Sequence, residues 1–339
     1  MTDPRGPGAG ASGGPDPAAS WRPAASAQTL RERAALLANV RAFFAERGVL
    51  EVETPIASRS AATDPAIESL VTHWSGPGGQ QPLYLQTSPE FRMKRLLAAG
   101  LGPVYQICKV FRDGERGRLH HPEFTLLEWY RPGWSYDRLM EEVAELVRRA
   151  LDQPGLAIEH LTYRELFLDR LGVDPWSADP RSFRDKALVL GISGAESLTL
   201  DRDGWLDLLL THALEPGLGR GRLTFLRDYP PSQAALARVR EGEVPVAERF
   251  EFYLEAVELA NGFQELTDAT AQRARFEADL RARRGLGLPT PPADEALLAA
   301  LAAGMPEGSG VALGLDRLLM ARVGAYHIDA VLAFPIERA

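Results

Sequence analysis

Apolar residues recur three or four positions apart near the start of the chain, as they do on one face of a helix. The residues of this series are Leu30, Ala34, Leu37, Val40 and Phe44. Their spacing predicts a helix over residues 29–47 that is ended by Gly48. Short apolar runs predict the strands that follow, over residues 49–56, 83–86, 104–112, 124–130, 223–226, 249–259, 262–267 and 311–313.

Helical patterns return later in the chain. The strongest covers residues 136–151, and further helices are expected over residues 270–284, 295–303 and 316–323. Residues 160–220 are expected to form a set of short helices, with turn signals at Gly172, Pro175 and Gly191. Long strand runs with helices clustered between them favour an α+β fold over a regularly alternating parallel one.

The first residues differ in composition from the rest. Gly, Pro, Ala and Ser make up 20 of residues 1–27. Such a segment cannot bury enough apolar area to offset the entropy of ordering it. We therefore predict a disordered tail over residues 1–28 and one folded domain over residues 29–339, and a start-site artefact explains the tail equally well.

The chain has 339 residues, with 38 Lys and Arg against 46 Asp and Glu and a formal net charge of −8. This balance argues against a broad basic surface for nucleic acid, although a local basic groove remains open. Cys108 is the only cysteine, which fits a reducing cytoplasm. No apolar run approaches the roughly 18 residues of a membrane span, and residues 1–27 lack the apolar segment of a secretory signal.

Familiar motifs for nucleotides, metals and nucleophiles are missing from the sequence. It contains no G-x-x-x-x-G-K-[ST], H-E-x-x-H, C-x-x-C or G-x-S-x-G segment. The adjacent His120 and His121 form a pair of a kind that is more often structural than metal-binding. Any nucleotide would have to be held by charged side chains on a sheet rather than by a glycine-rich loop.

Arg112 follows an otherwise apolar strand run. A guanidinium in that position is costly unless it meets an anion, and its planar fork suits phosphate or carboxylate. A long polar loop follows and leads into the strand that begins near Phe124. The alternative is a surface arginine on an edge strand.

Glu251, Glu258 and Glu265 follow one another at intervals of seven. Carboxylates suit Mg²⁺, which is usually held by one or two of them together with substrate phosphates. If residues 249–259 form one strand, Glu251 and Glu258 face opposite sides unless a bulge intervenes, because side chains alternate along a strand. The spacing therefore does not by itself predict a metal site, and solvated acidic residues explain it equally well.

Residues 310–317 predict a glycine-containing strand that runs directly into the last helix. Glycines there let a backbone or a flat ring approach closely. Arg317 falls in the first turn of that helix, where a cation is unfavourable unless an anion binds beside the helix amides.

In this order, the segments resemble the signature motifs of the class II aminoacyl-tRNA synthetases, and most closely the lysine-type catalytic domain. The helix over residues 29–47 with its following strand resembles motif 1, the dimer-forming element. Residues 111–124 resemble motif 2, and residues 310–317 resemble motif 3. The resemblance covers residues 29–339 and implies a class II synthetase-like antiparallel sheet flanked by helices, with ATP and Mg²⁺ as cofactors and a homodimer.

Length separates the members of this family. Only 28 residues precede motif 1, whereas lysyl-tRNA synthetases carry an anticodon-binding barrel there. The chain is therefore similar to the freestanding family of elongation factor P–(R)-β-lysine ligases, and no recognition of a tRNA anticodon is expected. The resemblance implies that (R)-β-lysine, or lysine, is activated as an adenylate and transferred to a lysine side chain of elongation factor P.

Two alternatives remain open at this point. One is a truncated lysyl-tRNA synthetase, against which the short leader and the acidic balance count. The other is a catalytically inactive regulatory paralogue, which would be expected to lack motif arginines or metal acids that are all present here.

The resemblance also implies roles for individual residues. Arg112 and Arg317 would be catalytic, and Glu251 and Glu258 would bind the metal. The residues implied at ATP are Arg112, Asp113, Gly114, Glu115, His121, Phe124, Glu258, Leu259, Gly314 and Arg317. The residues implied at the amino acid are Ser88, Pro89, Glu90, Glu128, Tyr130, Asn261, Glu265 and Ala312.

Three positions depart from the family pattern. His121 stands where the family usually has an asparagine beside the adenine. Gly114 stands where motif 2 has an acid, a place that Glu115 would take. Ala312 stands where motif 3 has its middle glycine, and we expect the added methyl group to shift the preference from α-lysine to β-lysine.

Overall fold

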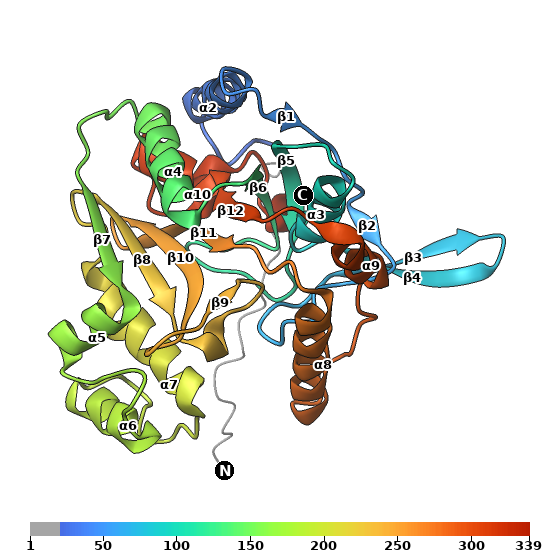
Figure 1. The fold of residues 1–339 in the computed structure, drawn as a ribbon. Coiled ribbons are helices and arrows are strands. Elements are labelled where there is room, and N and C mark those ends of the chain that lie inside the picture. Colours follow the sequence, from blue (N-terminus) through green and yellow to red (C-terminus); the bar gives the residue numbers. More distant parts are fainter. Residues whose placement is uncertain (1–20) are drawn as a thin grey trace, which may run out of the picture.

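The computed structural model describes residues 21–339. Its centre is a nine-stranded sheet in the order β1-β5-β6-β12-β11-β10-β8-β7, with β9 paired to β10 (Figure 1). The pairs at the two edges, β1 with β5 and β7 with β8, are parallel, and the other pairs are antiparallel. The predicted α+β class with an antiparallel sheet flanked by helices is confirmed.

The strands of this sheet come from most of the chain. They are β1 (Leu50–Glu51), β5 (Val104–Phe111), β6 (Glu123–Pro132), β7 (Ile158–Thr162), β8 (Leu223–Tyr229), β9 (Val239–Arg240), β10 (Val246–Leu254), β11 (Val257–Gln264) and β12 (Gly308–Gly314). A separate sheet contains β2 (Ala57–Ser58), β4 (Gly79–Leu85) and β3 (Val71–Gly76). The β3–β4 hairpin projects away from the rest of the molecule in Figure 1.

Three helices cover one face of the large sheet: α2 (Ala27–Ala45), α4 (Tyr136–Leu151) and α10 (Leu315–Val323). Phe44 of α2 stacks on Tyr105 of β5, with ring centroids 4.4 Å apart, and meets Trp129 of β6 edge-on at 5.4 Å. These rings belong to the largest buried apolar cluster. Because strand side chains alternate between the two faces, the polar residues of these strands are left to the opposite face.

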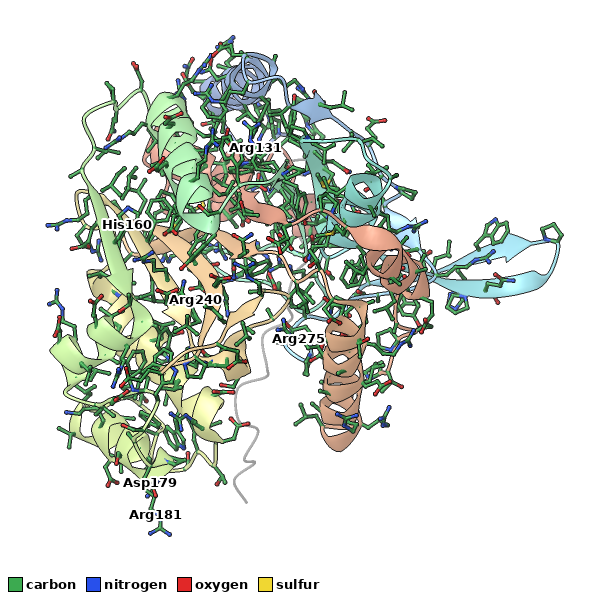
Figure 2. The ribbon with its side chains drawn as sticks, viewed as in Figure 1. Arg131, His160, Asp179, Arg181, Arg240 and Arg275 are labelled. Atoms are coloured by element: carbon green, nitrogen blue, oxygen red, sulfur yellow. The ribbon has the colours of Figure 1, made fainter. Side chains whose placement is uncertain are left out.

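Two further groups of helices extend beyond the sheet. One consists of α5 (Tyr163–Leu171), α6 (Pro180–Val189) and α7 (Arg202–Leu209), and its apolar residues pack against β8 and β10. The other consists of α3 (Glu90–Ala98), α8 (Ala269–Gly285) and α9 (Glu295–Gly304), which share a smaller core. In Figure 2, Asp179 and Arg181 mark the outer end of the first group and Arg275 marks α8. Among the residues described, no helix is long and apolar enough to cross a membrane.

The prediction of one strand over residues 249–259 is wrong. The segment forms a hairpin of β10 and β11, whose two-residue turn is Glu255 and Ala256. Both turn residues have a positive φ, 50° and 61°. Two-residue hairpin turns need such angles and usually obtain them from Gly, Asn or Asp, so this turn carries no sequence signal.

The start of the chain also differs from the prediction. Residues 1–20 lie outside the described part, so the proposed tail can be compared only from Trp21 onward. The backbone N–H groups of Ala24 and Ala25 donate to the carbonyls of Ala333 and Leu332, and helix α2 already begins at Ala27. The last residues assigned to the tail therefore belong to the fold.

Candidate active site

The polar face of the sheet gathers residues from β6, β11 and β12. Ala312 of β12 lies between its cross-strand partners Asn261 of β11 and Glu128 of β6. In the next row, Gly310 lies beside Tyr130. Directly paired residues point to the same side of a sheet, so these side chains share one surface. Three strands that carry residues predicted to contact the amino acid thus meet here.

Three acidic side chains and one lysine form what we call the carboxylate cluster: Glu90, Glu128, Glu265 and Lys94. Glu128 accepts hydrogen bonds from the hydroxyls of Ser88 (2.7 Å) and Tyr130 (2.6 Å). The backbone N–H of Glu90 donates to the same Ser88 hydroxyl at 3.0 Å, while the intervening Pro89 precedes the first turn of α3. Sequence analysis missed Lys94, which is 1% exposed.

The carboxylate cluster favours bound protons when it is empty. Burial, with the nearby charge of Glu90, raises the pKa of Glu128 to about 8. Burial raises the pKa of Glu265 to about 7, although Lys94 opposes the shift. Burial would lower the pKa of Lys94, but the charges of Glu265 and Glu90 outweigh it and raise that pKa. At neutral pH, the two carboxyls therefore titrate within reach of a cationic ligand.

Gly310 is required by close packing beneath the carboxylate cluster. A Cβ atom on Gly310 would lie 2.3 Å from the Tyr130 ring and 2.5 Å from Glu265 Oε1. Any side chain at residue 310 would push one of these groups away. The strand glycine therefore serves to seat Tyr130 and Glu265, as its position in the sequence suggested.

The β10–β11 hairpin brings the two predicted metal acids to one side. Glu251 lies on β10, and Glu258 lies on β11 opposite Tyr253. A register shift after Phe252 pairs Glu258 with Tyr253, which lies on the same face of β10 as Glu251, so the two acids share one face. The Tyr253 hydroxyl is 2.5 Å from Glu251 Oε2. Oxygen ligands in a pair suit Mg²⁺, which takes its remaining ligands from water and phosphate. The hairpin thus removes the objection that their spacing raised.

Burial, with the charge of Glu251, raises the pKa of the carboxyl groups near that residue. Burial and the charge of Glu251 raise the pKa of Glu258, and burial with Glu251 raises the pKa of Glu215 to about 7. Arg249 is an ion-pair partner of Glu251 and lies 3.4 Å from Asn261 Oδ1. Residues 21–339 contain no cluster of three or more His, Cys, Asp or Glu that could hold a metal ion by itself. The arrangement suits a cation shared with phosphates.

Arg112 lies directly after β5 at the same face. Its guanidinium is 5.1 Å from the centroid of the Phe124 ring and 3.6 Å from Glu115 Oε1. The buried Nε of Arg112 has no hydrogen-bond partner in the described structure, so it can donate to an anion. Gly114 takes a φ of +75°, and its N–H donates to Asp113 Oδ1 at 2.9 Å. Glycine stands here because the loop turns through the left-handed region.

Arg317 lies in the first turn of α10 and reaches toward the hairpin. Its guanidinium donates to the backbone carbonyl of Glu258 at 2.8 Å and lies 2.9 Å from His120 Nε2. Burial and the charge of Arg317 lower the pKa of His120. Gly314 precedes α10 without a capping side chain, so the first helix amides remain open to an anion.

A family model for class II tRNA synthetases (D, K and N) matches residues 17–338. The chain belongs to this family. It is also 51% identical over 324 residues to the elongation factor P–(R)-β-lysine ligase of Salmonella typhi, covering 95% of this chain and 99% of that protein. The resemblance inferred from the motifs is confirmed, and the chain is an ATP-dependent ligase.

Arg112 and Arg317 lie in the segments that we predict to be class II motifs 2 and 3. Two of the predicted ATP contacts need refinement. Leu259 is 3% exposed and packs in the large apolar cluster, so only its backbone is available to a nucleotide. His121 is 4% exposed, with Nδ1 2.5 Å from the Glu123 carbonyl and Nε2 accepting from the Ile336 N–H. Both ring nitrogens are thus occupied, and an adenine contact through His121 remains a prediction.

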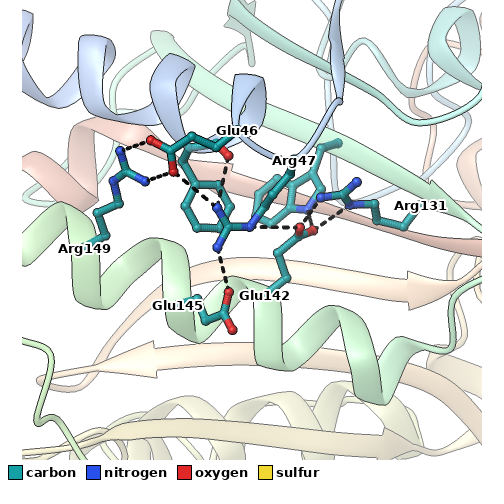
Figure 3. Close-up of polar contacts among 8 residues, drawn as sticks. Glu46, Arg47, Arg131, Glu142, Glu145 and Arg149 are labelled. Carbon is teal, nitrogen blue, oxygen red and sulfur yellow. Dashed lines mark hydrogen bonds and ion pairs between the residues drawn. The ribbon is translucent and has the colours of Figure 1, made fainter.

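An ion-pair network connects motif 1 with the strand of motif 2 (Figure 3). Arg47, just after α2, pairs with Glu145 at 2.9 Å and Glu142 at 3.9 Å, both on α4. Glu142 in turn pairs with Arg131 of β6, and both side chains are buried. Arg131 directly follows Tyr130, so the network braces the strand that presents the carboxylate cluster.

Sequence analysis missed several residues on this surface. Arg249 and Tyr253 had a readable signal, since they alternate with Phe250, Phe252 and Leu254 and share the face of Glu251. Lys94 stands four residues after Glu90, a spacing that predicts an ion pair on one face of a helix. Its burial had no local signal, because a lysine inside a short helix usually lies in solvent. Its burial depends on Glu265, which lies far away in the sequence.

Proposed function

We propose that this chain activates (R)-β-lysine with ATP as an aminoacyl-adenylate and transfers it to a lysine side chain of elongation factor P. The proposal is carried by the near full-length similarity to a ligase of that name. It is supported by a surface with arginines for phosphate at one end and carboxylates for ammonium groups at the other. The described chain thus offers complementary charge to each end of an activated dibasic amino acid.

In the first step, a carboxylate oxygen of the amino acid attacks the α-phosphorus of ATP, and the bond to pyrophosphate breaks. Arg112, with its unpartnered buried Nε, is placed to hold the α-phosphate and the attacking carboxylate. Arg317 and the open amides of α10 are placed to hold the outgoing phosphates. Fixed positive groups of this kind stabilise the charge that develops in the transition state.

Glu251 and Glu258 would hold Mg²⁺, since both carboxylates face one side of the hairpin. When bound, the ion would neutralise phosphate charge. Arg249 keeps Glu251 oriented, and the Arg317 contact to the Glu258 carbonyl fixes the start of β11.

The second step forms an amide. An amine of the acceptor attacks the adenylate carbonyl carbon, AMP leaves with the electron pair of the broken bond, and the nitrogen loses a proton. No general base is required if the amine arrives deprotonated. A lysine side chain of a protein carries an amine that attacks in its neutral form, and the name of the relative includes elongation factor P.

We also propose a homodimer formed through motif 1, that is, α2 and β1. Leu50 of β1 is 51% exposed at an edge of the large sheet. Light scattering would give twice the monomer mass if this edge is covered by a second copy, and the monomer mass would reject the assembly.

The decisive experiment mixes the purified protein with ATP, (R)-β-lysine and unmodified elongation factor P. Intact-mass spectrometry should show elongation factor P gain one β-lysyl group, and reactions without ATP or with Arg112→Ala should show none. Charging of tRNA with no gain on elongation factor P would instead support a truncated synthetase. Absence of amino-acid-dependent ATP–pyrophosphate exchange would support an inactive paralogue.

A further inference from the structure

Lys94 places a positive charge inside the group of acids assigned to the substrate. Its Nζ lies 2.5 Å from Glu90 Oε1 and 2.6 Å from Glu265 Oε2. Glu90 and Lys94 come from α3, Glu128 from β6, and Glu265 follows β11, so three separate elements supply the charges. Lysine is seldom buried to this degree unless it is paired, and here it has two partners.

The carboxylate cluster does not use all of its hydrogen-bonding capacity. Glu265 Oε1 is buried and has no hydrogen-bond partner within the described chain. Its side chain is only 2% exposed, so bulk water does not replace that partner. An acceptor of this kind is costly unless something donates to it. An ammonium group of a ligand is a donor of the required charge.

The charges of the carboxylate cluster and of a dibasic substrate balance only when Lys94 is included. With every group ionised, three carboxylates and one ammonium leave the carboxylate cluster with two negative charges. An amino acid with two ammonium groups, whose own carboxylate lies at Arg112, would neutralise both. Without Lys94, one carboxylate would remain uncompensated, and a buried uncompensated charge is strongly unfavourable.

We propose that Lys94 determines specificity as an internal counter-charge, setting the carboxylate cluster to the two negative charges that a substrate with two ammonium groups matches. The inference rests on the proposed function, because it takes the carboxylate cluster as the amino-acid site. It adds that selectivity for a dibasic substrate comes from the total charge of the carboxylate cluster, which the positive charge of Lys94 makes less negative by one.

The test compares Glu265→Gln with the double variant Lys94→Met/Glu265→Gln. The single variant leaves one negative charge, whereas the double variant restores two, and neither contains Glu265. We expect Glu265→Gln to raise the KM for (R)-β-lysine in ATP–pyrophosphate exchange by about 30-fold or more. The added Lys94→Met substitution should then lower that KM by about tenfold, so the double variant binds better than the single one.

The preference between substrates with one and two ammonium groups provides a second measurement on the same variants. The single variant should shift its kcat/KM ratio toward a substrate with one ammonium group, such as norleucine, and the double variant should shift it back. Lys94→Arg keeps the charge and should retain the preference of the unmodified enzyme. A purely structural role for Lys94 would make the double variant equal to or worse than the single one in both measurements, and would overturn the proposal.

A parallel pair guards against misfolding of the Glu265 variants. Glu90→Gln and Lys94→Met/Glu90→Gln carry the same charges as the first pair and should show the same order of KM. If no dibasic amino acid supports ATP–pyrophosphate exchange by the unmodified enzyme, the proposed function itself fails. If it does exchange, and the double variants are not better than the single ones, only the role of Lys94 is rejected.

Discussion

Asp316 of α10 accepts a hydrogen bond from the backbone N–H of Thr125 in β6, at 2.6 Å and in the buried interior. The same carboxylate pairs with Arg33 of α2. One side chain therefore joins motif 3, which carries Arg317, to motif 2 and to the helix of motif 1. Its position beside Arg317 in the sequence makes the first turn of α10 depend on this connection.

Asp316→Asn should therefore destabilise the fold. The amide keeps one acceptor but leaves Arg33 without its anion, and breaking a buried pair costs about 3 kcal/mol. Urea unfolding should show a lower midpoint with an unchanged slope. Glu295→Gln is the matched control, since it removes an exposed pair with Arg273 and should leave the midpoint unchanged. Equal midpoints for the two variants would contradict the role given to Asp316.

Glu142→Gln should weaken the connection between α4 and β6. Glu142 accepts from the Trp129 indole at 3.0 Å and from Arg131 Nε at 2.9 Å, and it is 4% exposed. Its loss leaves a buried guanidinium unpaired, so the free energy of unfolding should fall by about 3 kcal/mol. Glu145→Gln removes the more exposed partner of Arg47 and serves as control. If Glu145→Gln proved the more damaging change, the network in Figure 3 would not brace β6.

The acidity of the carboxylate cluster predicts opposite pH trends for stability and for binding. The pKa of Glu128 rises from 4.5 to about 8 in the fold, and that of Glu265 rises to about 7. A raised folded-state pKa favours the fold at low pH and loses that contribution as pH rises through it. The free enzyme should therefore lose stability between about pH 4.5 and pH 8.

Binding of a dibasic substrate should become stronger as the pH rises, whereas the stability of the free enzyme falls. A dibasic substrate needs ionised carboxylates, so its KM should fall by up to about tenfold per pH unit between pH 6 and pH 8 for each proton released. Calorimetry in two buffers of different ionisation enthalpy counts those protons. Glu128→Gln should remove part of the pH dependence of the melting temperature, and an unchanged profile would show that Glu128 is already ionised in the free enzyme.

Much of this fold was predictable from local patterns, and the site less so. The amphipathic spacing of α4 gave its bounds, Tyr136–Leu151, because a helix that packs on a sheet needs one apolar face. The β10–β11 turn was missed because Glu255 and Ala256 adopt left-handed angles that their residue types do not signal. That one turn decided whether Glu251 and Glu258 could act together.

Contacts between distant segments account for the rest. Lys94 meets Glu265 only after α3 and the end of β11 are folded together, and no local rule places a lysine between two acids. Arg112 and Arg317 were found from their local context. Arg112 follows an apolar strand run and Arg317 lies in the first turn of a helix, and in both places a positive charge is unfavourable unless an anion binds. The motif resemblance supplied the roles that physical reasoning about single segments left open.

Ala312 should control the choice between the two lysine isomers. It lies beside Asn261 and Glu128, on the floor of the proposed amino-acid site. Ala312→Gly removes one methyl group and should lower the ratio of β-lysine to α-lysine activation by about tenfold, the usual worth of one such group. Val311→Ala, on the apolar face at 2% exposure, should affect stability and leave the ratio unchanged. An unchanged ratio in Ala312→Gly would place the selectivity elsewhere.

Arg317→Lys should separate charge from geometry at the phosphate end. The guanidinium reaches the Glu258 carbonyl, the Leu119 carbonyl and His120 at once, which a single ammonium cannot reproduce. We expect kcat for pyrophosphate exchange to fall by about 100-fold, because a fixed donor at developing charge is lost. Arg322→Lys on the same helix is the control, since Arg322 pairs with Glu32 away from the site. It should lower stability only. A fall in exchange that Arg322→Lys matches would mean that α10 acts on catalysis through its packing and that Arg317 does not itself hold phosphate.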